Sequence, residues 1–372
     1  MIEKDEDKML KAAKASIKAE KQLGKTVTNV NDDAIIQYFE LIKQGNMPIM
    51  IGVKNTDQIE RRIIKKLLDT KRYVWHTIDE MSEGGRAVDM NLLNPLTGKI
   101  MTGSSSATAI NVLYGINDIG IGTDGGGSVL APALSLNLFS IMAKGMGLKG
   151  NTGRISTDKI DFLPGIGIIS QCFELAEQSI YTMLELNNDC ELPTTNIKVL
   201  VCKNGNLELP DGSDMRKKLN STVETLTQLG IKIYEEEFPN FIERQASIAW
   251  ANKMLEKYDI IITCEGPVDL MGLGDSVFGG MGNFAKSHQN RSGKYLVKIA
   301  NMINATAVTI PIDEAASGLV ITAREGMKCG RAAIELGKKL MNLYRLPDLY
   351  YNYFRDSYKR RSSNNIFSVK GV

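Results

Sequence analysis

The chain has 372 residues, of which 43% are hydrophobic and 24% charged, and its formal net charge at pH 7 is +2. That length suits one large α/β domain or two small ones, and the nearly balanced charge excludes a strongly basic nucleic-acid binder as the default. No apolar run approaches the roughly 20 residues that span a bilayer, and the charged start MIEKDEDKMLKAAK is unlike a secretory signal. We therefore expect a cytoplasmic protein that has no membrane segment.

The cysteines and histidines give no sign of a disulfide framework or a metal site. The five cysteines are scattered and odd in number: Cys172, Cys190, Cys202, Cys264 and Cys329. This pattern favours free thiols in a reducing compartment. The histidines are His76 and His288, and no His/Cys cluster has the spacing of zinc ligands. We expect neither a metal nor another cofactor, and homo-oligomerisation is left open.

The N-terminal third is predicted to contain three helices and two strands. Residues 1–25 form a helical segment, in which the Lys/Glu/Ala-rich residues 3–23 lie as a solvated helix on the rim. A second helix begins near residue 31, and its predicted buried stripe consists of Ile35, Ile36, Phe39 and Ile42. The apolar run PIMIGVK (48–54) predicts a buried strand, and a helix over 59–70 leads to a second strand over 73–77.

The rest of the chain alternates between predicted strands and helices. Residues 100–170 are rich in glycine, serine and alanine, which indicates close backbone packing around a site. Further strands are predicted at 197–203, 231–238, 258–263, 305–311 and 318–322, with a helix over 214–229. Such alternation favours one α/β/α domain, over residues 26–345, around a mixed, mostly parallel central sheet. A tyrosine-rich tail over 346–372 is expected to be loosely ordered from Tyr350 onward.

The densest run of glycines is GIGTDGGGSVLAPA, residues 120–133. It does not fit a P-loop, because the lysine that a P-loop needs after its last glycine is absent and Ser128 is followed by valine. The dinucleotide pattern G-x-G-x-x-G matches Gly120, Gly122 and Gly125 only weakly, since no typical helix or acidic partner follows. A structural turn is the plain alternative. The remaining interpretation is a nucleophile, Ser128, beside backbone N–H groups that stabilise an oxyanion.

Two upstream positions supply the other groups that such a nucleophile needs. The small-residue cluster TGSSSATA contains Ser104, which precedes Ser128 by 24 residues. Lys54 ends the apolar strand over 48–54, where burial is expected to favour the neutral amine. A desolvated lysine is a workable general base. A Ser-His-Asp arrangement is hard to build, because neither histidine lies in a motif.

These motifs resemble the amidase signature hydrolases. The similarity extends from IGVKN through TGSSSATA and GIGTDGGGSVLAPA to GLKGNTGRIS, KYDIIIT and NMINATAVTIP, and so covers roughly residues 30–340. The resemblance implies the amidase signature fold and a serine hydrolase that cleaves linear amide C–N bonds of a small molecule. It implies that Ser128 is the nucleophile and Lys54 the general base, with Ser104 bridging them beside a non-proline cis peptide. It also implies an oxyanion hole formed by the N–H groups of Gly125, Gly126 and Gly127, together with Ser128.

The chain departs from the pattern of this family in several respects, one of which is a shorter stretch from Lys54 to Ser104. Ser106 and Ala107 stand where the family usually has glycines. Leu130 replaces the usual arginine two residues after the nucleophile, so Asp124 needs another partner, for which Arg154 is a candidate. A further glycine-rich loop, GLGDSVFGGMGNF (272–284), either lines the acyl pocket or lies on the surface.

The expected activity is amide hydrolysis through an acyl-enzyme on Ser128. Two alternatives stay open: an amidotransferase-type subunit or acyl transferase on the same scaffold, and a degenerate homologue without catalysis. The retention of Lys54, Ser104 and Ser128 favours catalysis. The residues that bind the substrate are not identified by the sequence.

Overall fold

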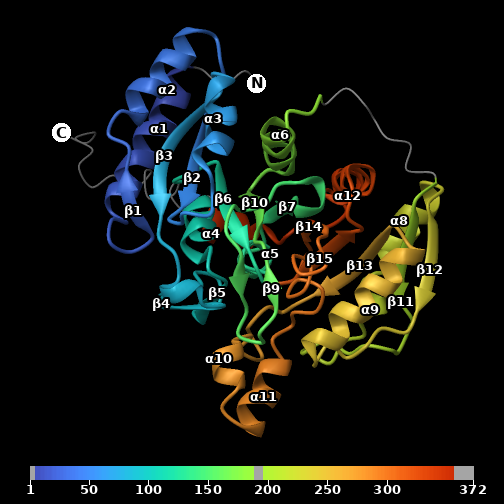
Figure 1. The fold of residues 1–372 in the computed structure, drawn as a ribbon. Helices are drawn as coiled ribbons and strands as arrows, with labels where there is room; N and C mark the ends of the chain where they lie inside the picture. The colour runs from blue at the N-terminus through green and yellow to red at the C-terminus, as the bar shows by residue number, and fades with distance from the viewer. Residues whose placement is uncertain (1–4, 188–195, 356–372) are drawn as a thin grey trace.

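In the computed structural model, residues 5–187 and 196–355 are described, and Cys190 lies outside them (Figure 1). The strands are β1 (Val27–Val30), β2 (Ile49–Lys54), β3 (Tyr73–Asp79), β4 (Val88–Leu93), β5 (Ile100–Thr102), β6 (Ile119–Asp124), β7 (Phe139–Met142), β8 (Arg154–Ile155), β9 (Asp161–Phe162), β10 (Gly165–Ser170), β11 (Lys198–Cys202), β12 (Lys232–Glu236), β13 (Ile260–Glu265), β14 (Thr306–Pro311) and β15 (Gly318–Ala323). The helices are α1 (Asp5–Glu20), α2 (Ala34–Lys43), α3 (Arg61–Asp69), α4 (Ser106–Leu113), α5 (Leu130–Ser135), α6 (Phe173–Met183), α7 (Met215–Lys218), α8 (Asn220–Gln228), α9 (Arg244–Lys257), α10 (Ser276–Gly279), α11 (Asn283–Asn290), α12 (Met327–Leu340) and α13 (Asp348–Tyr350).

One 11-stranded sheet runs through the described part of the chain, in the order β1-β3-β2-β6-β10-β7-β14-β15-β13-β11-β12. The predicted class, one α/β domain around a mixed sheet, is confirmed. The expectation that the sheet is mostly parallel is wrong, because six of its ten described strand pairs are antiparallel. The centre is antiparallel because β10 returns between β6 and β7, and because β14 and β15 form a hairpin. Parallel pairs flank this centre.

Helices cover both faces of the sheet, and β2 shows how its side chains alternate between them. Ile51 packs in the main core with the apolar face of α3. On the same face α3 contacts α6, and α6 contacts α12. Met50 points the other way and packs with Ala12 of α1 and Tyr38 of α2. A strand buried on both faces is apolar throughout, which explains why PIMIGVK lacks polar alternation.

The two N-terminal helices differ from their predicted burial. α1 is not simply solvated on the rim: its Ala12, Ala15 and Ala19 are buried. In α2 the predicted stripe is confirmed at Ile42 and wrong at Ile36 and Phe39, which are 58% and 41% exposed. The buried face runs through Ala34, Tyr38, Leu41 and Ile42. The small alanines of α1 pack against α2. The face of α2 that lies against α1 is buried, whatever the hydrophobicity of its other residues.

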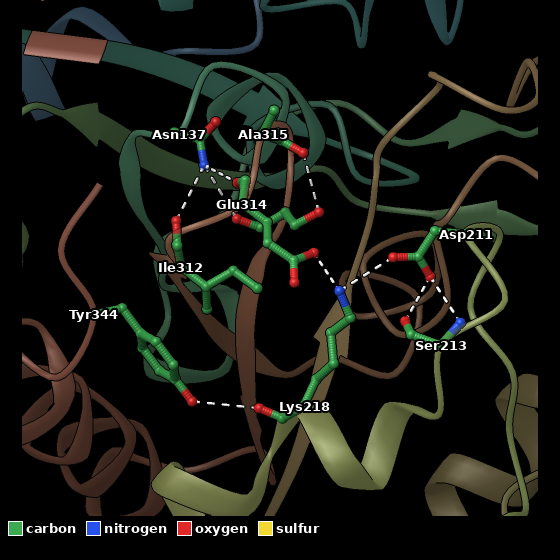
Figure 2. Close-up of polar contacts among 9 residues, drawn as sticks. Asn137, Asp211, Ser213, Lys218, Ile312, Glu314, Ala315 and Tyr344 are labelled. Carbon is green, nitrogen blue, oxygen red and sulfur yellow. Dashed lines mark hydrogen bonds and ion pairs between the residues drawn. The ribbon is translucent and has the colours of Figure 1, made fainter. Parts of the chain in front are cut away.

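The C-terminal part is fastened to the centre of the sheet by polar contacts. The predicted helix over 214–229 is divided at Leu219 into α7 and α8. Lys218, the last residue of α7, donates to Asp211 at 3.1 Å and also forms an ion pair with Glu314 in the β14–β15 connection, as Figure 2 shows. Asn137 donates to the carbonyl of Glu314 at 2.7 Å from the other side. Glu314 is therefore held through both its carboxylate and its backbone carbonyl.

The start of the predicted loose tail is ordered. Tyr350 is buried, and its hydroxyl donates to the carbonyl of Leu136 at 2.9 Å. A short π-helical turn follows over Tyr351–Arg355, and residues 356–372 lie outside the described part. Every helix in the described ranges is too short or too polar to cross a membrane.

Candidate active site

Lys54 lies at the end of β2 and is 3% exposed. Its Nζ donates to Ser104 Oγ at 2.6 Å and to Thr123 Oγ1 at 3.0 Å. Thr123 comes from β6, which runs parallel to β2, so the C-terminal ends of both strands meet at the same edge of the sheet. The pairing of β2 with β6 thus places the hydroxyl of Thr123 beside the amine of Lys54.

The partners of this lysine are hydroxyl groups, and this has an electrostatic consequence. Burial lowers the pKa of Lys54 to about 7, opposed by the attraction of Asp124 and assisted by the repulsion of Arg154. Hydroxyls hydrogen-bond the amine without providing the full negative charge that would hold its proton. At neutral pH a substantial fraction of Lys54 is therefore the free amine, which is able to accept a proton.

Ser104 is carried by a tight turn between β5 and α4. Gly103 has φ +73°, and a Cβ at this position would lie 2.5 Å from Pro132 in α5, so the close approach requires glycine. The N–H of Ser105 donates to the carbonyl of Ser128 at 3.3 Å, which ties the two serine segments together. The cis peptide expected beside Ser104 is not found: among the described residues the cis bond is Gly266–Pro267. The turn is made by the left-handed glycine instead.

The serines that follow Ser104 are used in the structure of the turn. Ser106 occupies the first position of α4, and its Oγ donates to the buried carboxylate of Asp89 at 2.6 Å. Ser105 is fully buried, and its Oγ has no hydrogen-bond partner among the described residues. The substitution of the usual glycine by Ser106 is therefore accommodated by a specific acceptor.

Asp124 organises the glycine loop through backbone contacts. Its two oxygens accept from the N–H groups of Gly127 at 2.7 Å, Val129 at 2.7 Å and Leu130 at 3.2 Å. The expected partner Arg154 is wrong, because its side chain is half exposed and lies 3.7 Å from Asp57. Three backbone donors satisfy the buried carboxylate, so the chain needs no arginine at position 130 for this purpose.

The glycine loop packs against residues 295–301, which we call the backing segment. A Cβ on Gly127, which has φ +98°, would lie 2.7 Å from Val297, so this position is closed to any side chain. Asn301 donates to the carbonyl of Gly125 at 3.1 Å and accepts from the N–H of Gly165 at 2.7 Å. Glu265 in turn accepts from the N–H of Leu296 at 2.7 Å and so anchors the backing segment.

Lys54, Ser104 and Ser128 line one cavity of about 420 Å³. Gly125 and Gly126 line the same cavity, and Ser128 is half-buried there. The N–H of Gly127 is committed to Asp124, whereas those of Gly126 and Ser128 have no acceptor among the described residues. Within the described ranges the side chains of Ser104 and Ser128 form no hydrogen bond with each other.

Several residues of the cavity carried no signal in the sequence. Arg86 and Arg244 lie in its wall, and Arg86 forms an ion pair with the buried Asp275. Single arginines in polar surroundings resemble surface residues, so only the fold identifies them. Thr123 could have been found from the sequence, because it lies inside the GTD motif, at the end of the strand β6 that pairs with the strand of Lys54.

One part of the second glycine-rich loop (272–284) lines the cavity, and another part lies on the surface. Asp275, Ser276 and Val277 line the cavity, while Phe284 is 81% exposed. Figure 1 shows its helices α10 and α11 projecting from the body of the sheet. Part of the loop therefore belongs to the site and part to the surface.

Comparison of the sequence with family models and with curated proteins gives no match. The structure is similar to a solved amidase, with a TM-score of 0.61 and 14% identity over 90% of this chain and 95% of that one. It is similar to allophanate hydrolase from Kluyveromyces lactis, with a TM-score of 0.60 and 14% identity over 93% of this chain and 72% of that one. It is also similar to one of the subunits of glutamyl-tRNA(Gln) amidotransferase from Thermotoga maritima, with a TM-score of 0.58 and 13% identity over 92% and 95% of the two chains. The chain thus has the fold of amidase signature enzymes.

Proposed function

We propose that the protein hydrolyses a carboxylic amide through an acyl-enzyme on Ser128. The observation that carries the proposal is the 2.6 Å contact between Lys54 and Ser104 in the cavity that Ser128 also lines. A buried charged lysine without a carboxylate partner is unfavourable, so burial favours the neutral amine that a general base needs. The shared fold with amidases supports this chemistry without identifying the residues.

The proposed reaction moves one proton along a short relay. Neutral Lys54 accepts the proton of Ser104, which accepts the proton of Ser128 as Ser128 Oγ attacks the amide carbon. The N–H groups of Gly126 and Ser128, with that of Gly125, donate to the oxyanion that forms. One proton passes back through the relay to the leaving nitrogen as the C–N bond breaks, and water then attacks the acyl-enzyme with the same relay taking up its proton.

The proposal assigns the oxyanion hole differently from the simple pattern of three glycines. Gly127 already donates its N–H to Asp124 at 2.7 Å. Its role is then to hold the loop, while Gly126 and Ser128 provide the donors. In this proposal Gly127 has a structural role in the loop, and its neighbours stabilise the oxyanion.

The test is covalent labelling of the purified protein with a fluorophosphonate. We expect the label on the peptide that contains Ser128, and no label in a folded Ser128→Ala variant. A folded wild-type protein that stays unlabelled, or that is labelled elsewhere, contradicts the assignment.

Release of ammonia from small amides separates hydrolysis from transfer. Hydrolysis requires ammonia release by the isolated protein in buffer alone. If release needs an added acceptor such as hydroxylamine, the chain acts as an acyl transferase. This second outcome agrees with the fold shared with an amidotransferase component.

A further inference from the structure

A second cavity, of about 300 Å³, adjoins the one that contains Ser128. Ala87, Gly126 and Arg244 line both cavities. Gly126 lies two residues before the proposed nucleophile, so the second cavity begins where an amide bound at Ser128 would continue. The two cavities together therefore offer room for a substrate larger than the reacting amide group.

The wall of the second cavity is rich in positive charge. Its lining contains two carboxylates, those of Asp158 and Glu243, and four basic side chains, those of Arg244, Lys286, Lys294 and Lys298. Three of these have carboxylate partners: Arg244 with Asp158 at 2.5 Å, Lys286 with Glu243 at 3.6 Å, and Lys294 with Asp269 at 2.7 Å. The positive charge that remains is therefore concentrated on the fourth.

Lys298 has no carboxylate within ion-pair distance among the described residues. Its Nζ donates to the carbonyl of Phe241, and the side chain is partly buried. Burial, assisted by the repulsion of Arg244 and opposed by the attraction of Glu265, lowers the pKa of Lys298 to about 8. A cation removed from water without a counter-ion is unfavourable, and an anion in the cavity would relieve this cost.

The carboxylate of Glu265 does not fill this role. It already accepts from the N–H groups of Tyr295 at 2.6 Å and Leu296 at 2.7 Å, and its attraction only partly opposes the lowering of the lysine pKa. That contact fixes the segment that carries Lys298. Glu265 therefore holds the lysine in position beside the cavity and leaves its amine available there.

We propose that the second cavity binds a carboxylate of the substrate, through Lys298 and Arg244, so that the protein acts on small amides that carry an acidic group. The inference rests on the proposed function, since it places the reacting amide at Ser128. A carboxylate accepts charge-assisted hydrogen bonds from both cations, and these are stronger than those between neutral groups.

Binding is measured on the folded Ser128→Ala variant, in which hydrolysis does not interfere. The probes are succinamate and succinamide, which have the same shape and differ by one negative charge. We expect succinamate to bind at least about tenfold more tightly, as is typical of a hydrogen-bonded charge pair. Equal dissociation constants within this pair and within the second pair of probes described below, both titrated with NMR detection, overturn the proposal.

Substitutions added to this variant assign the preference to one residue. Lys298→Gln is expected to reduce the ratio of the two dissociation constants to near one, and Lys298→Arg to retain most of it. Lys286→Gln removes the same charge from the same cavity but at a more exposed position, and is expected to change the ratio little. An equal fall of the ratio in Lys286→Gln would mean that the overall positive charge of the cavity causes the preference and that no carboxylate contacts Lys298. That result also overturns the proposal. Thermal unfolding checks that each variant is folded.

A second pair of probes decides which side of the amide carries the acid. N-propionylglycine and its primary amide differ in charge on the amine side, whereas the first pair differs on the acyl side. Preference for the charged member of either pair supports the subsite and assigns its side. Wild-type hydrolysis of succinamide tests the proposed function separately, because it requires Ser128 but no acidic group. Hydrolysis without charge preference therefore rejects the subsite alone.

Discussion

Lys54 and Lys218 are enclosed lysines in two regions of the molecule, and their partners differ. Lys54 contacts the hydroxyls of Ser104 and Thr123, and burial lowers its pKa to about 7. Lys218 contacts the carboxylates of Asp211 and Glu314 (Figure 2). Burial also acts to lower the pKa of Lys218, but the hydrogen bonds and attraction of these carboxylates raise it above its ordinary value.

The difference shows that the depth of burial and the charge of the partners together decide which form a lysine adopts. Carboxylates keep Lys218 charged, which suits a residue that joins α7 to the β14–β15 connection. Hydroxyls leave Lys54 near the balance between its two forms, which suits a group that must take up and release a proton at neutral pH. Four experiments test this contrast, beginning with the largest expected effect.

Removal of the serines is expected to abolish amide hydrolysis. We expect Ser128→Ala to lower kcat by roughly 10⁴-fold or more, as with other members of a catalytic unit. Ser104→Ala should lose a similar amount, and the double variant little more, because the relay works only as a whole. Steady-state kinetics on all three variants provide the measurement. Losses that multiply in the double variant contradict a shared relay.

Removal of the lysine is expected to lower kcat/KM by about 10³-fold, within the range of general base catalysis. In the wild type, protonation inactivates the base, so kcat/KM should rise about tenfold per pH unit below pH 7 and level off above it. Lys54→Ala should lose this ionisation. Lys218→Ala is the matched control, and it should retain the wild-type profile. An unchanged profile in Lys54→Ala would identify a different base.

A carboxylate placed beside Lys54 should make it resemble Lys218. In Thr123→Asp, the added negative charge favours the protonated amine, so the apparent pKa in the kcat/KM profile should rise by at least about one unit. Activity at pH 7 then falls about fivefold or more and recovers at higher pH. Thr123→Asn has the same shape without the charge and should leave the pKa near its wild-type value. A shift of equal size in both variants would argue against electrostatic control.

The smallest effect is expected at the Lys218 contact. Glu314→Gln removes one of its two carboxylates, and both partners are partly exposed, so the free energy of unfolding should fall by about 1 kcal/mol or less. Urea denaturation at neutral pH measures this change. The kcat/KM profile should stay unchanged, since the contact lies outside the cavity that contains Ser128. A shifted profile would mean that the two regions are coupled.

The sequence by itself determined the buried strands and the residues of the candidate site. Continuous apolar runs such as PIMIGVK become buried strands because only the interior accepts them. The positions of Lys54, Ser104 and Ser128 followed from local motifs, and the structure brings all three to one cavity. Their roles in catalysis stay predictions, because proximity shows which groups meet and leaves open which of them react.

Only the tertiary structure decided the features that depend on distant contacts. The antiparallel centre of the sheet arises from the path of β10 and the β14–β15 hairpin, which no local pattern records. Asp124 finds its donors in the backbone because the loop folds back on it. Arg244 and Lys298 meet beside Gly126 from segments far apart in the chain. A single basic residue looks the same on a surface and in a site, and only the neighbours that folding provides distinguish the two.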